Sequence, residues 1–224
     1  MKTKITVLLL FFIVSFGASA QYKPYYFGFK IAPAISWLRS TNDDYQNDGA
    51  KAAFSWGFVS EFNFSENHSL ATGFNVLFDG GKLLFPAKVN SDTGMMSRNY
   101  SLKFIEIPLT LKMRTNDIKG LRYFGQIGLG TSFRIGSKAT DTFYHGSLTT
   151  VGKKYTFDKI AFIHESLIIG LGAEYSLAAG TILGGGVTFN NGFTDILTSL
   201  NTKNSKIKDN GTLNFIELNF YILF

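Results

Sequence analysis

Two short motifs in the sequence could support hydrolytic chemistry, because each places a histidine two residues before a serine. They are His145-Gly146-Ser147 and His164-Glu165-Ser166. A histidine that accepts the serine proton turns the hydroxyl into a nucleophile, as ester hydrolysis requires. The first pair lies in a segment rich in Gly, Thr and Ser, where this spacing arises by chance. Spacing alone does not supply the third group and the geometry of a catalytic triad, so we expect no enzyme.

The other reactive residue types argue against metal, cofactor and nucleic-acid chemistry. The 224 residues include no cysteine and three scattered histidines, too few ligands for a zinc-type site. We therefore predict no metal site and no cofactor. The formal net charge is +6, but Lys and Arg are spread along the chain without interleaved stacking aromatics. We expect no nucleic-acid partner.

The elements that would position any of these residues are strands, because large apolar side chains alternate with small or polar ones along most of the chain. Each alternating segment is about a dozen residues long, as in membrane barrels. The predicted strands are 26–37, 53–64, 69–79, 105–114, 121–135, 162–175, 181–193 and 212–224. Long connections follow the first, third, fifth and seventh strands, and short turns follow the others.

An even number of strands joined alternately by long loops and short turns is the signature of a bacterial outer-membrane barrel. The bulky apolar parity would overfill an eight-stranded interior, whereas the glycine-rich parity fits inside it. We therefore predict an all-β fold, an eight-stranded antiparallel transmembrane up-and-down β-barrel of OmpA/OmpX-like size. The alternative is a soluble lipocalin-like barrel with the same alternation turned inside out.

The N-terminal residues 1–20 have the features of a cleaved secretory signal peptide. Lys2 and Lys4 precede an apolar run over residues 5–16, and Ala18-Ser19-Ala20 forms a small-residue cleavage site. No other segment is long and apolar enough for a membrane-spanning helix. We predict a barrel domain over residues 21–224, located in the cell outer membrane of a Gram-negative bacterium.

The last predicted strand ends on an aromatic residue of its apolar parity. Phe220, Ile222 and Phe224 share this parity, while Glu217, Asn219 and Tyr221 share the other. We expect the first three to form the assembly signal that barrel-assembly machinery recognises.

Charged residues on the inward parity are expected to form a polar network in the lumen, because buried charges must be paired. The predicted members are Lys30, Glu61, Glu106, Lys112, Arg122, Arg134, Glu174 and Glu217. Glu106 and Glu217 are expected to face Arg122, Lys112 or Arg134. A narrow gated conduit is the alternative interpretation of the same residues.

One strand resembles a known family. Residues 104–112, F-I-E-I-P-L-T-L-K, resemble a strand of the PorT-like outer-membrane β-barrel family of Bacteroidetes. The opening Gly28–Pro33 segment and the glycine-rich later strands are similar too, so the resemblance covers residues 22–224. It implies a porin-family outer-membrane barrel, and because the family's named member belongs to a protein-secretion and gliding apparatus, secretion-system proteins are candidate partners. Pro108 predicts a local β-bulge, since proline removes a ladder hydrogen bond.

Together these features predict a structural, binding or transport role with its specificity in four extracellular loops. The alternatives are a narrow small-solute porin and a component of a protein-secretion apparatus, and a barrel lipid hydrolase is a remote one. The expected partners include outer-membrane lipid and lipopolysaccharide, whose phosphates loop lysines could meet. These are Lys138, Lys153, Lys154, Lys203, Lys206 and Lys208; they could equally be solvated loop charges.

Overall fold

The computed structural model describes residues 23–89, 92–145, 148–155, 159–177, 180–198 and 210–224, so the predicted signal peptide lies outside the described residues. The strands are β1 (Tyr25–Arg39), β2 (Gln46–Asn47), β3 (Lys51–Asn63), β4 (His68–Val89), β5 (Asp92–Arg114), β6 (Leu121–His145), β7 (Leu148–Tyr155), β8 (Ile163–Ser176), β9 (Ile182–Gly192) and β10 (Thr212–Leu223). None of the described residues belongs to a helix that is long and apolar enough to cross a membrane.

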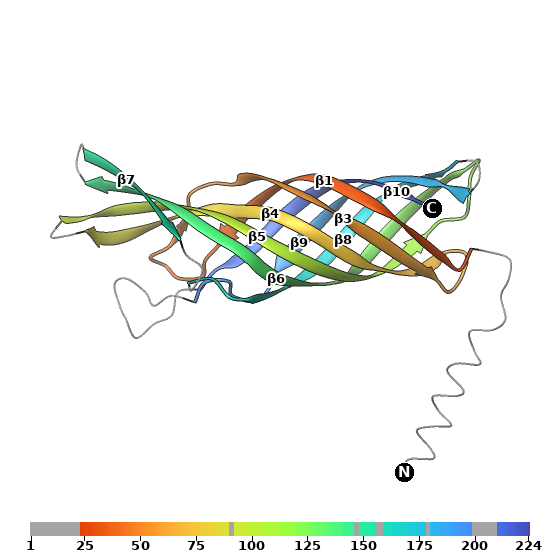
Figure 1. Cartoon of the computed structure of the whole chain (residues 1–224), viewed down its shortest axis with the longest axis horizontal. Helices are drawn as coiled ribbons and strands as arrows, with labels where there is room; N and C mark the ends of the chain where they lie inside the picture. The colour runs from red at the N-terminus through yellow and green to blue at the C-terminus, as the bar shows by residue number, and fades with distance from the viewer. Residues whose placement is uncertain (1–22, 90–91, 146–147, 156–158, 178–179, 199–209) are drawn as a thin grey trace, which may run out of the picture.

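Eight of the strands close into a barrel in which every neighbour is antiparallel (Figure 1). The order around the barrel is β1, β3, β4, β5, β6, β8, β9 and β10. β10 pairs with β1 through contacts such as Phe220 opposite Ile31, which leaves no open edge in the wall. The predicted fold class is confirmed.

The two ends of the barrel differ (Figure 1). Three short connections, β3–β4, β5–β6 and β8–β9, lie at one end, together with Lys23 and Phe224; we call it the turn end. Lys119 and Gly120 adopt positive φ angles of 58° and 86° there, which lets the β5–β6 turn reverse within a few residues. The other four connections, β1–β3, β4–β5, β6–β8 and β9–β10, lie at the opposite end, which we call the hairpin end.

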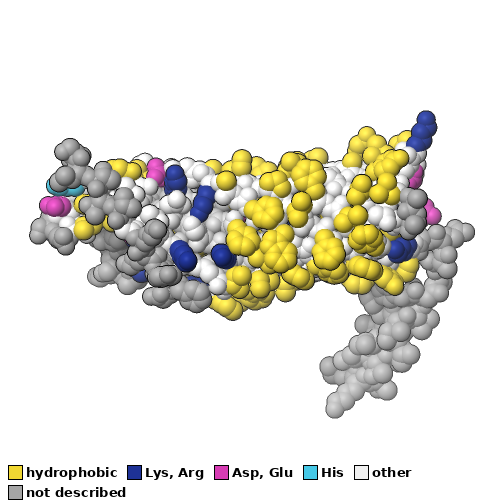
Figure 2. Space-filling view, turned by 45° about the horizontal axis from the view of Figure 1, so that its top comes forward, with side chains coloured by type: hydrophobic (Ala, Val, Ile, Leu, Met, Phe, Trp, Pro, Cys, Tyr) yellow, Lys and Arg dark blue, Asp and Glu magenta, His cyan; other side chains and the backbone are white. Residues whose placement is uncertain are grey.

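The apolar side chains point outward, as the volume argument predicted. Figure 2 shows a band of hydrophobic side chains across the face of the barrel wall that is turned toward the viewer. On β5, Leu109 is 53% exposed while its lumen-facing neighbour Thr110 is 4% exposed. The wall therefore presents an apolar belt, and its interior is polar, which is the arrangement a lipid-embedded barrel requires.

Three strands are much longer than the alternation predicted. Residues 80–100 and 136–158 were expected to be loops. Instead, β4 and β5 remain paired as far as Val89 and Asp92. β6 extends to His145, and its last residues pair with β7. The apolar parity changes at Gly80 and Gly81: Phe78 faces outward, whereas Leu83 and Phe85 are buried inside. In these extensions the largest apolar side chains face inward while the outer face mixes polar residues with a few apolar ones such as Met95 and Tyr144, so the pattern that identified the strands no longer holds there.

The predicted bulge at Pro108 is wrong. Pro108 pairs with Gly130 of β6 in an unbroken register, and the register shift in this ladder lies between Lys103 and Phe104. On the other side, the β4–β5 ladder skips the residues opposite Pro108 but keeps the same register before and after. Thr72 Oγ1 donates to the Pro108 carbonyl at 2.8 Å. The strand thus accommodates the missing N–H by a local gap in the ladder.

Candidate functional site

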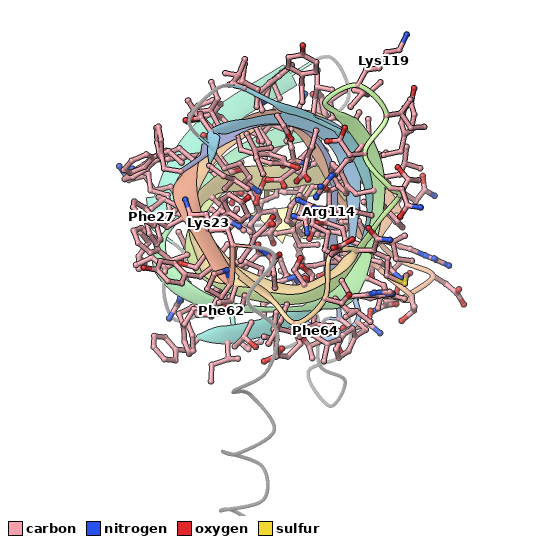
Figure 3. All side chains as sticks on the ribbon, turned by 90° about the vertical axis from the view of Figure 1, so that its right-hand side faces the viewer. Lys23, Phe27, Phe62, Phe64, Arg114 and Lys119 are labelled. Atoms are coloured by element: carbon pink, nitrogen blue, oxygen red, sulfur yellow. The ribbon has the colours of Figure 1, made fainter. Side chains whose placement is uncertain are left out.

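A network of buried charges closes the lumen near the turn end. We call it the ionic plug, and its members are Glu61, Ser69, Lys112, Arg114, Glu174 and Tyr221. Figure 3 views the barrel from the turn end and shows Arg114 inside the ring, whereas Phe27, Phe62 and Phe64 point away from it. The six residues come from β3, β4, β5, β8 and β10, so the network joins most of the circumference.

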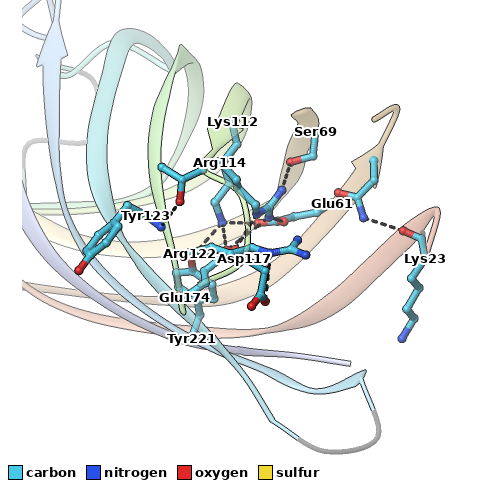
Figure 4. Close-up of polar contacts among 12 residues, drawn as sticks. Lys23, Glu61, Ser69, Lys112, Arg114, Asp117, Arg122, Tyr123, Glu174 and Tyr221 are labelled. Carbon is cyan, nitrogen blue, oxygen red and sulfur yellow. Dashed lines mark hydrogen bonds and ion pairs between the residues drawn. The ribbon is translucent and has the colours of Figure 1, made fainter. Parts of the chain in front are cut away.

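Lys112 occupies the centre of the ionic plug (Figure 4). Its Nζ donates to Glu61 Oε1 at 2.7 Å, to the Tyr221 hydroxyl at 2.9 Å and to Glu174 Oε1. The ammonium also lies 4.2 Å from the centroid of the Phe124 ring. All three donors of the amine are used, and an aromatic face supplies further stabilisation of the charge.

Arg114 binds the same two carboxylates from the other side. Its Nε donates to Glu174 Oε2 at 2.6 Å, its Nη1 to Ser69 Oγ at 2.8 Å and its Nη2 to Glu61. Two cations and two carboxylates give the ionic plug zero net charge, and the hydrogen bonds offset the cost of removing these ions from water. Arg114 was not among the predicted network residues, although its parity, the same as that of Glu106 and Lys112, could have identified it.

A small polar chamber lies in the middle of the barrel, above the ionic plug. Its volume is about 70 Å³, which is room for about five water molecules. Lys30 Nζ lies 3.0 Å from Glu217 Oε2, and Ser55 donates to Glu217 Oε1 at 2.5 Å. Glu106 Oε1 accepts from Asn75 at 3.0 Å, while its Oε2 has no partner among the described residues. The chamber can hold water or a small polar solute.

Apolar side chains fill the lumen beyond the chamber, toward the hairpin end. We call this cluster the apolar plug; its most deeply buried members are Leu38, Leu77, Leu83, Phe85, Leu102, Phe104, Ile196, Leu213 and Phe215. Phe104 is fully buried and Phe215 is 1% exposed. The chamber is therefore bounded by a hydrophobic core on one side and by an ionic network on the other.

Six of the eight predicted lumen residues lie in the ionic plug or the chamber: Lys30, Glu61, Glu106, Lys112, Glu174 and Glu217. The predicted partners of Glu106 and Glu217 are wrong. Glu217 pairs with Lys30, and Glu106 pairs with Asn75, so neither faces Arg122, Lys112 or Arg134. Parity predicted the face of each residue correctly but gave no information on its height in the lumen.

Arg122 and Arg134 lie outside this network. Arg122 is partly exposed at the turn end, where its Nε is 3.5 Å from Asp117 Oδ2 in the β5–β6 turn. Arg134 is buried in β6, eight residues beyond Gln126, which pairs with Lys112. That separation is about 26 Å along a strand.

Of the two histidine–serine pairs, the one that the structure describes, His164 and Ser166, has no recorded hydrogen bond between its members. Ser147 lies outside the described residues. His164 and Ser166 are both buried, but Ser166 Oγ donates to the Gly130 carbonyl at 3.4 Å and His164 Nδ1 lies 3.2 Å from Thr194 Oγ1. Glu165 accepts from Thr131 Oγ1 at 2.9 Å, on the opposite face of β8.

The predicted assembly residues line the outer face of the closing strand. Phe220 and Phe224 are exposed in the apolar belt, and Ile222 is partly buried. Phe224 N donates to the Phe27 carbonyl at 2.8 Å, and the two rings lie 6.4 Å apart. Phe224 thus joins the two strands that close the barrel.

The comparisons with known proteins agree with this architecture. A family described as an outer membrane protein beta-barrel domain matches residues 19–198. The chain is similar to the crystal structure of Neisserial surface protein A, with 11% identity over 90% of this chain and 96% of that chain and a TM-score of 0.54. At this identity the likeness shows the fold alone.

Two further solved structures are similar at lower TM-scores. Outer membrane protein OprG from Pseudomonas aeruginosa has 11% identity over 90% of this chain and 96% of that chain, with a TM-score of 0.47. Ail, the attachment invasion locus protein of Yersinia pestis, has 12% identity over 90% and 100%, with a TM-score of 0.39. No curated protein sequence matches the chain.

Proposed function

The chain belongs to the outer membrane protein β-barrel domain family, and we propose that it is a closed, non-conducting barrel with a binding or structural role at its hairpin end. This end faces the cell exterior, because the short turns of outer-membrane barrels are periplasmic and the longer connections are extracellular. Residues 1–20 then serve as the cleaved signal peptide that directs the chain to export.

The observation that carries the proposal is the presence of two different barriers in one lumen. An ion that entered from the turn end would have to displace Lys112 and Arg114 from the carboxylates of Glu61 and Glu174. It would then have to pass the apolar plug, where Phe104 and Phe215 have almost no exposed surface. Either barrier alone opposes conduction, and the interior of an eight-stranded barrel is filled by side chains.

The hairpin end offers a rigid platform for binding. The sheet formed by β4, β5, β6 and β7 continues beyond the apolar belt (Figure 1). Inside it, the Arg98 guanidinium makes two hydrogen bonds to Asp141, at 2.5 Å and 2.6 Å, and lies 5.3 Å from the Phe85 ring. Tyr45 stacks on the other side of this cluster, with its ring centroid 4.7 Å from that of Phe85. A preorganised surface of this kind loses little entropy on binding.

We propose a non-catalytic role. The buried His164 and Ser166 hydrogen-bond to Thr194 and Gly130 rather than to each other. Hydrolysis would require a nucleophile and a base within hydrogen-bonding reach at a site that lipid or water can enter. A lipid-hydrolase assay with a Ser166→Ala control tests this point, and activity that the substitution abolishes would contradict it.

A place in a protein-secretion apparatus rests on the PorT-like resemblance alone. In β5, the motif residues Glu106, Pro108 and Lys112 alternate with Ile107, Leu109 and Leu111, which face outward. Glu106 and Lys112 contribute to the chamber and the ionic plug, so lumen packing accounts for much of the motif. Cross-linking in intact cells followed by identification of bound secretion proteins tests this narrower proposal.

The decisive experiment is single-channel recording in planar bilayers. We expect no stable conductance steps from the wild-type protein. A variant without the ionic plug (Glu61→Ala, Lys112→Ala, Arg114→Ala and Glu174→Ala) is also expected to remain closed, because the apolar plug is intact. Further replacement of Phe104 and Phe215 by Ala should produce steps, and a shift in gel mobility on boiling establishes that each variant is folded. Reproducible wild-type steps would sink the closed-barrel proposal.

A further inference from the structure

Four lysines have their amines at the outer surface, at the point where the apolar belt ends toward the hairpin end. They are Lys51, Lys82, Lys103 and Lys138, and we call them the basic cluster. Each belongs to a different one of four adjacent strands, β3, β4, β5 and β6. Figure 2 shows a group of Lys and Arg side chains beside the hydrophobic band on this part of the surface.

On each of these strands the lysine lies just beyond the exposed apolar residue that ends the continuous belt, although Met95 and Tyr144 are also exposed farther along β5 and β6. On the hairpin side, Phe54 is followed by Lys51, Phe78 by Lys82, Ile105 by Lys103 and Ile135 by Lys138. The apolar belt ends at this point on all four strands, so the four amines lie at a similar depth in the membrane. At this depth the hydrocarbon region gives way to lipid headgroups.

Ser101 of β5 lies at the centre of the basic cluster. Lys51 Nζ donates to Ser101 Oγ at 2.6 Å, and Lys138 is paired directly opposite Ser101 in the β5–β6 ladder. Lys103 is two residues away on the same face, and Lys82 pairs with Asn99. Cross-strand neighbours in a ladder are about 5–8 Å apart, a spacing at which several amines can contact one phosphorylated headgroup.

The backbone provides space for this arrangement. Gly80 has no side chain, and a Cβ at that position would lie 3.3 Å from Lys51 Cδ. Lys51 starts from the lumen-facing parity of β3, where it pairs with Ser36, and its side chain passes Gly80 to reach Ser101. Lys103 Nζ lies 5.1 Å from the centroid of the Phe78 ring, with its stem along the apolar belt and its charge toward the headgroup level.

Part of the charge of the basic cluster has no carboxylate in direct contact among the described residues. Among the described residues, the recorded ion pairs include none from Lys51, Lys82 or Lys103. The buried Asp79 of β4 interacts electrostatically with Lys51, and Asp48 accepts from Ser97 near this face. An anion that bridges the amines would remove their mutual repulsion.

Among the residues whose side chains are described, the lysines at this level are concentrated on β3 to β6, with Lys159 just before β8. β1, which pairs with β3, adds the outward Arg39. The hairpin-end segments of β9 and β10 instead present Asn191 and Thr212 on their outer faces. A merely solvated rim would have no reason to concentrate lysines on four adjacent strands.

We propose that the basic cluster binds the phosphate groups of an anionic glycolipid in the outer leaflet of the membrane. Lysine amines bind phosphate as point charges, and the Ser101 hydroxyl and the Asn99 amide supply neutral hydrogen bonds between them. The proposal rests on the proposed function only for the orientation of the hairpin end. Of the loop lysines that the sequence suggested for this role, only Lys138 belongs to the basic cluster.

The test is a binding titration of the folded full chain in zwitterionic micelles, which does not depend on orientation. The probe is a bisphosphorylated lipid A-type glycolipid, and the control ligand is its dephosphorylated form. We expect the wild-type protein to bind the phosphorylated probe at least about tenfold more tightly, since each lysine near an anionic lipid surface contributes about a fivefold factor. The affinity should also fall as salt concentration rises.

Three variants separate the basic cluster from net charge and from folding. Replacing its four lysines with Gln should weaken binding of the phosphorylated probe at least about tenfold. Replacing Lys23, Lys88, Lys119 and Arg122 with Gln removes the same charge elsewhere and should leave binding unchanged, and the four-fold Lys→Arg variant should retain it. Equal affinity for the two glycolipids, or wild-type affinity of the four-fold Gln variant, would overturn the proposal.

Discussion

Arg114 of β5 and Glu174 of β8 meet inside the barrel, with Nε 2.6 Å from Oε2, although β6 lies between their strands in the wall. The contact therefore crosses the lumen rather than following the sheet. A second contact links β5 to β3, where Lys112 Nζ lies 2.7 Å from Glu61 Oε1. These contacts make the lumen charges a brace between distant parts of the wall as well as a barrier to ions.

Removal of one carboxylate from this brace should strongly destabilise the barrel. Glu174→Ala leaves Lys112 and Arg114 with Glu61 as the single remaining carboxylate of the ionic plug, and an uncompensated buried charge costs about 3–5 kcal/mol. The free energy of unfolding, measured in urea on the micelle-bound protein, should fall by this amount. Glu66→Ala in the exposed β3–β4 turn is the control, with an expected change within about 0.5 kcal/mol. Equal effects of the two substitutions would contradict a stabilising role for the ionic plug.

Two adjacent glycines of β9 provide a matched test of lumen packing. A Cβ on Gly184 would lie 2.0 Å from Tyr221 Cζ, whereas a Cβ on Gly185 would come no closer than 3.6 Å to any atom. Gly184→Ala should displace the Tyr221 ring from Lys112 and Glu174 and reduce unfolding free energy by about 1–3 kcal/mol. Gly185→Ala should have little effect. The comparison fails if both variants unfold at the same urea concentration.

The Arg98–Asp141 pair should control the rigidity of the hairpin end independently of the barrel. Burial alone lowers the pKa of Arg98, but the hydrogen bonds that Arg98 donates to Asp141 raise the pKa above its ordinary value, so the guanidinium remains charged. Asp141→Asn weakens these hydrogen bonds, and local stability should fall by about 1–3 kcal/mol. Hydrogen exchange should become faster in residues 92–101 and 136–145 but not near the turn end. Asp92→Asn, at an exposed position, is the control; uniform acceleration along all strands would argue against an independent extension.

Phe224 should matter more for assembly than for the finished barrel. Its backbone hydrogen bonds to Phe27 close the wall, and its ring adds an exposed aromatic to the terminal strand. Phe224→Ala should lower the fraction of heat-modifiable protein in outer membranes, while the protein that does assemble unfolds near the wild-type urea midpoint. Phe62→Ala removes a similarly exposed ring from β3 and serves as control. The assembly interpretation is wrong if both substitutions reduce the assembled fraction equally.

Alternation in the sequence predicted the eight wall strands and the outward face of each, because lipid on one side and a narrow lumen on the other impose opposite side-chain volumes. The same alternation failed in residues 80–100 and 136–158. Leu83 and Phe85 are apolar and inward, the reverse of Phe74 and Phe78 in the same strand. Outside the lipid the apolar face belongs to the interior, so a single parity rule could not extend across the boundary.

The sequence by itself determined the architecture and the inward direction of Glu61, Lys112, Glu174 and Glu217, since side-chain direction follows from strand parity. Only the tertiary structure decided which of these charges meet. Height in the lumen depends on the register accumulated around all eight strand pairs, and no single strand encodes that sum. For this reason Arg114 reaches Glu174 while Arg122, on the correct parity, pairs with Asp117 at the rim. The lysines of the basic cluster were likewise visible in the sequence, but closure of the barrel gathered the four of them around Ser101.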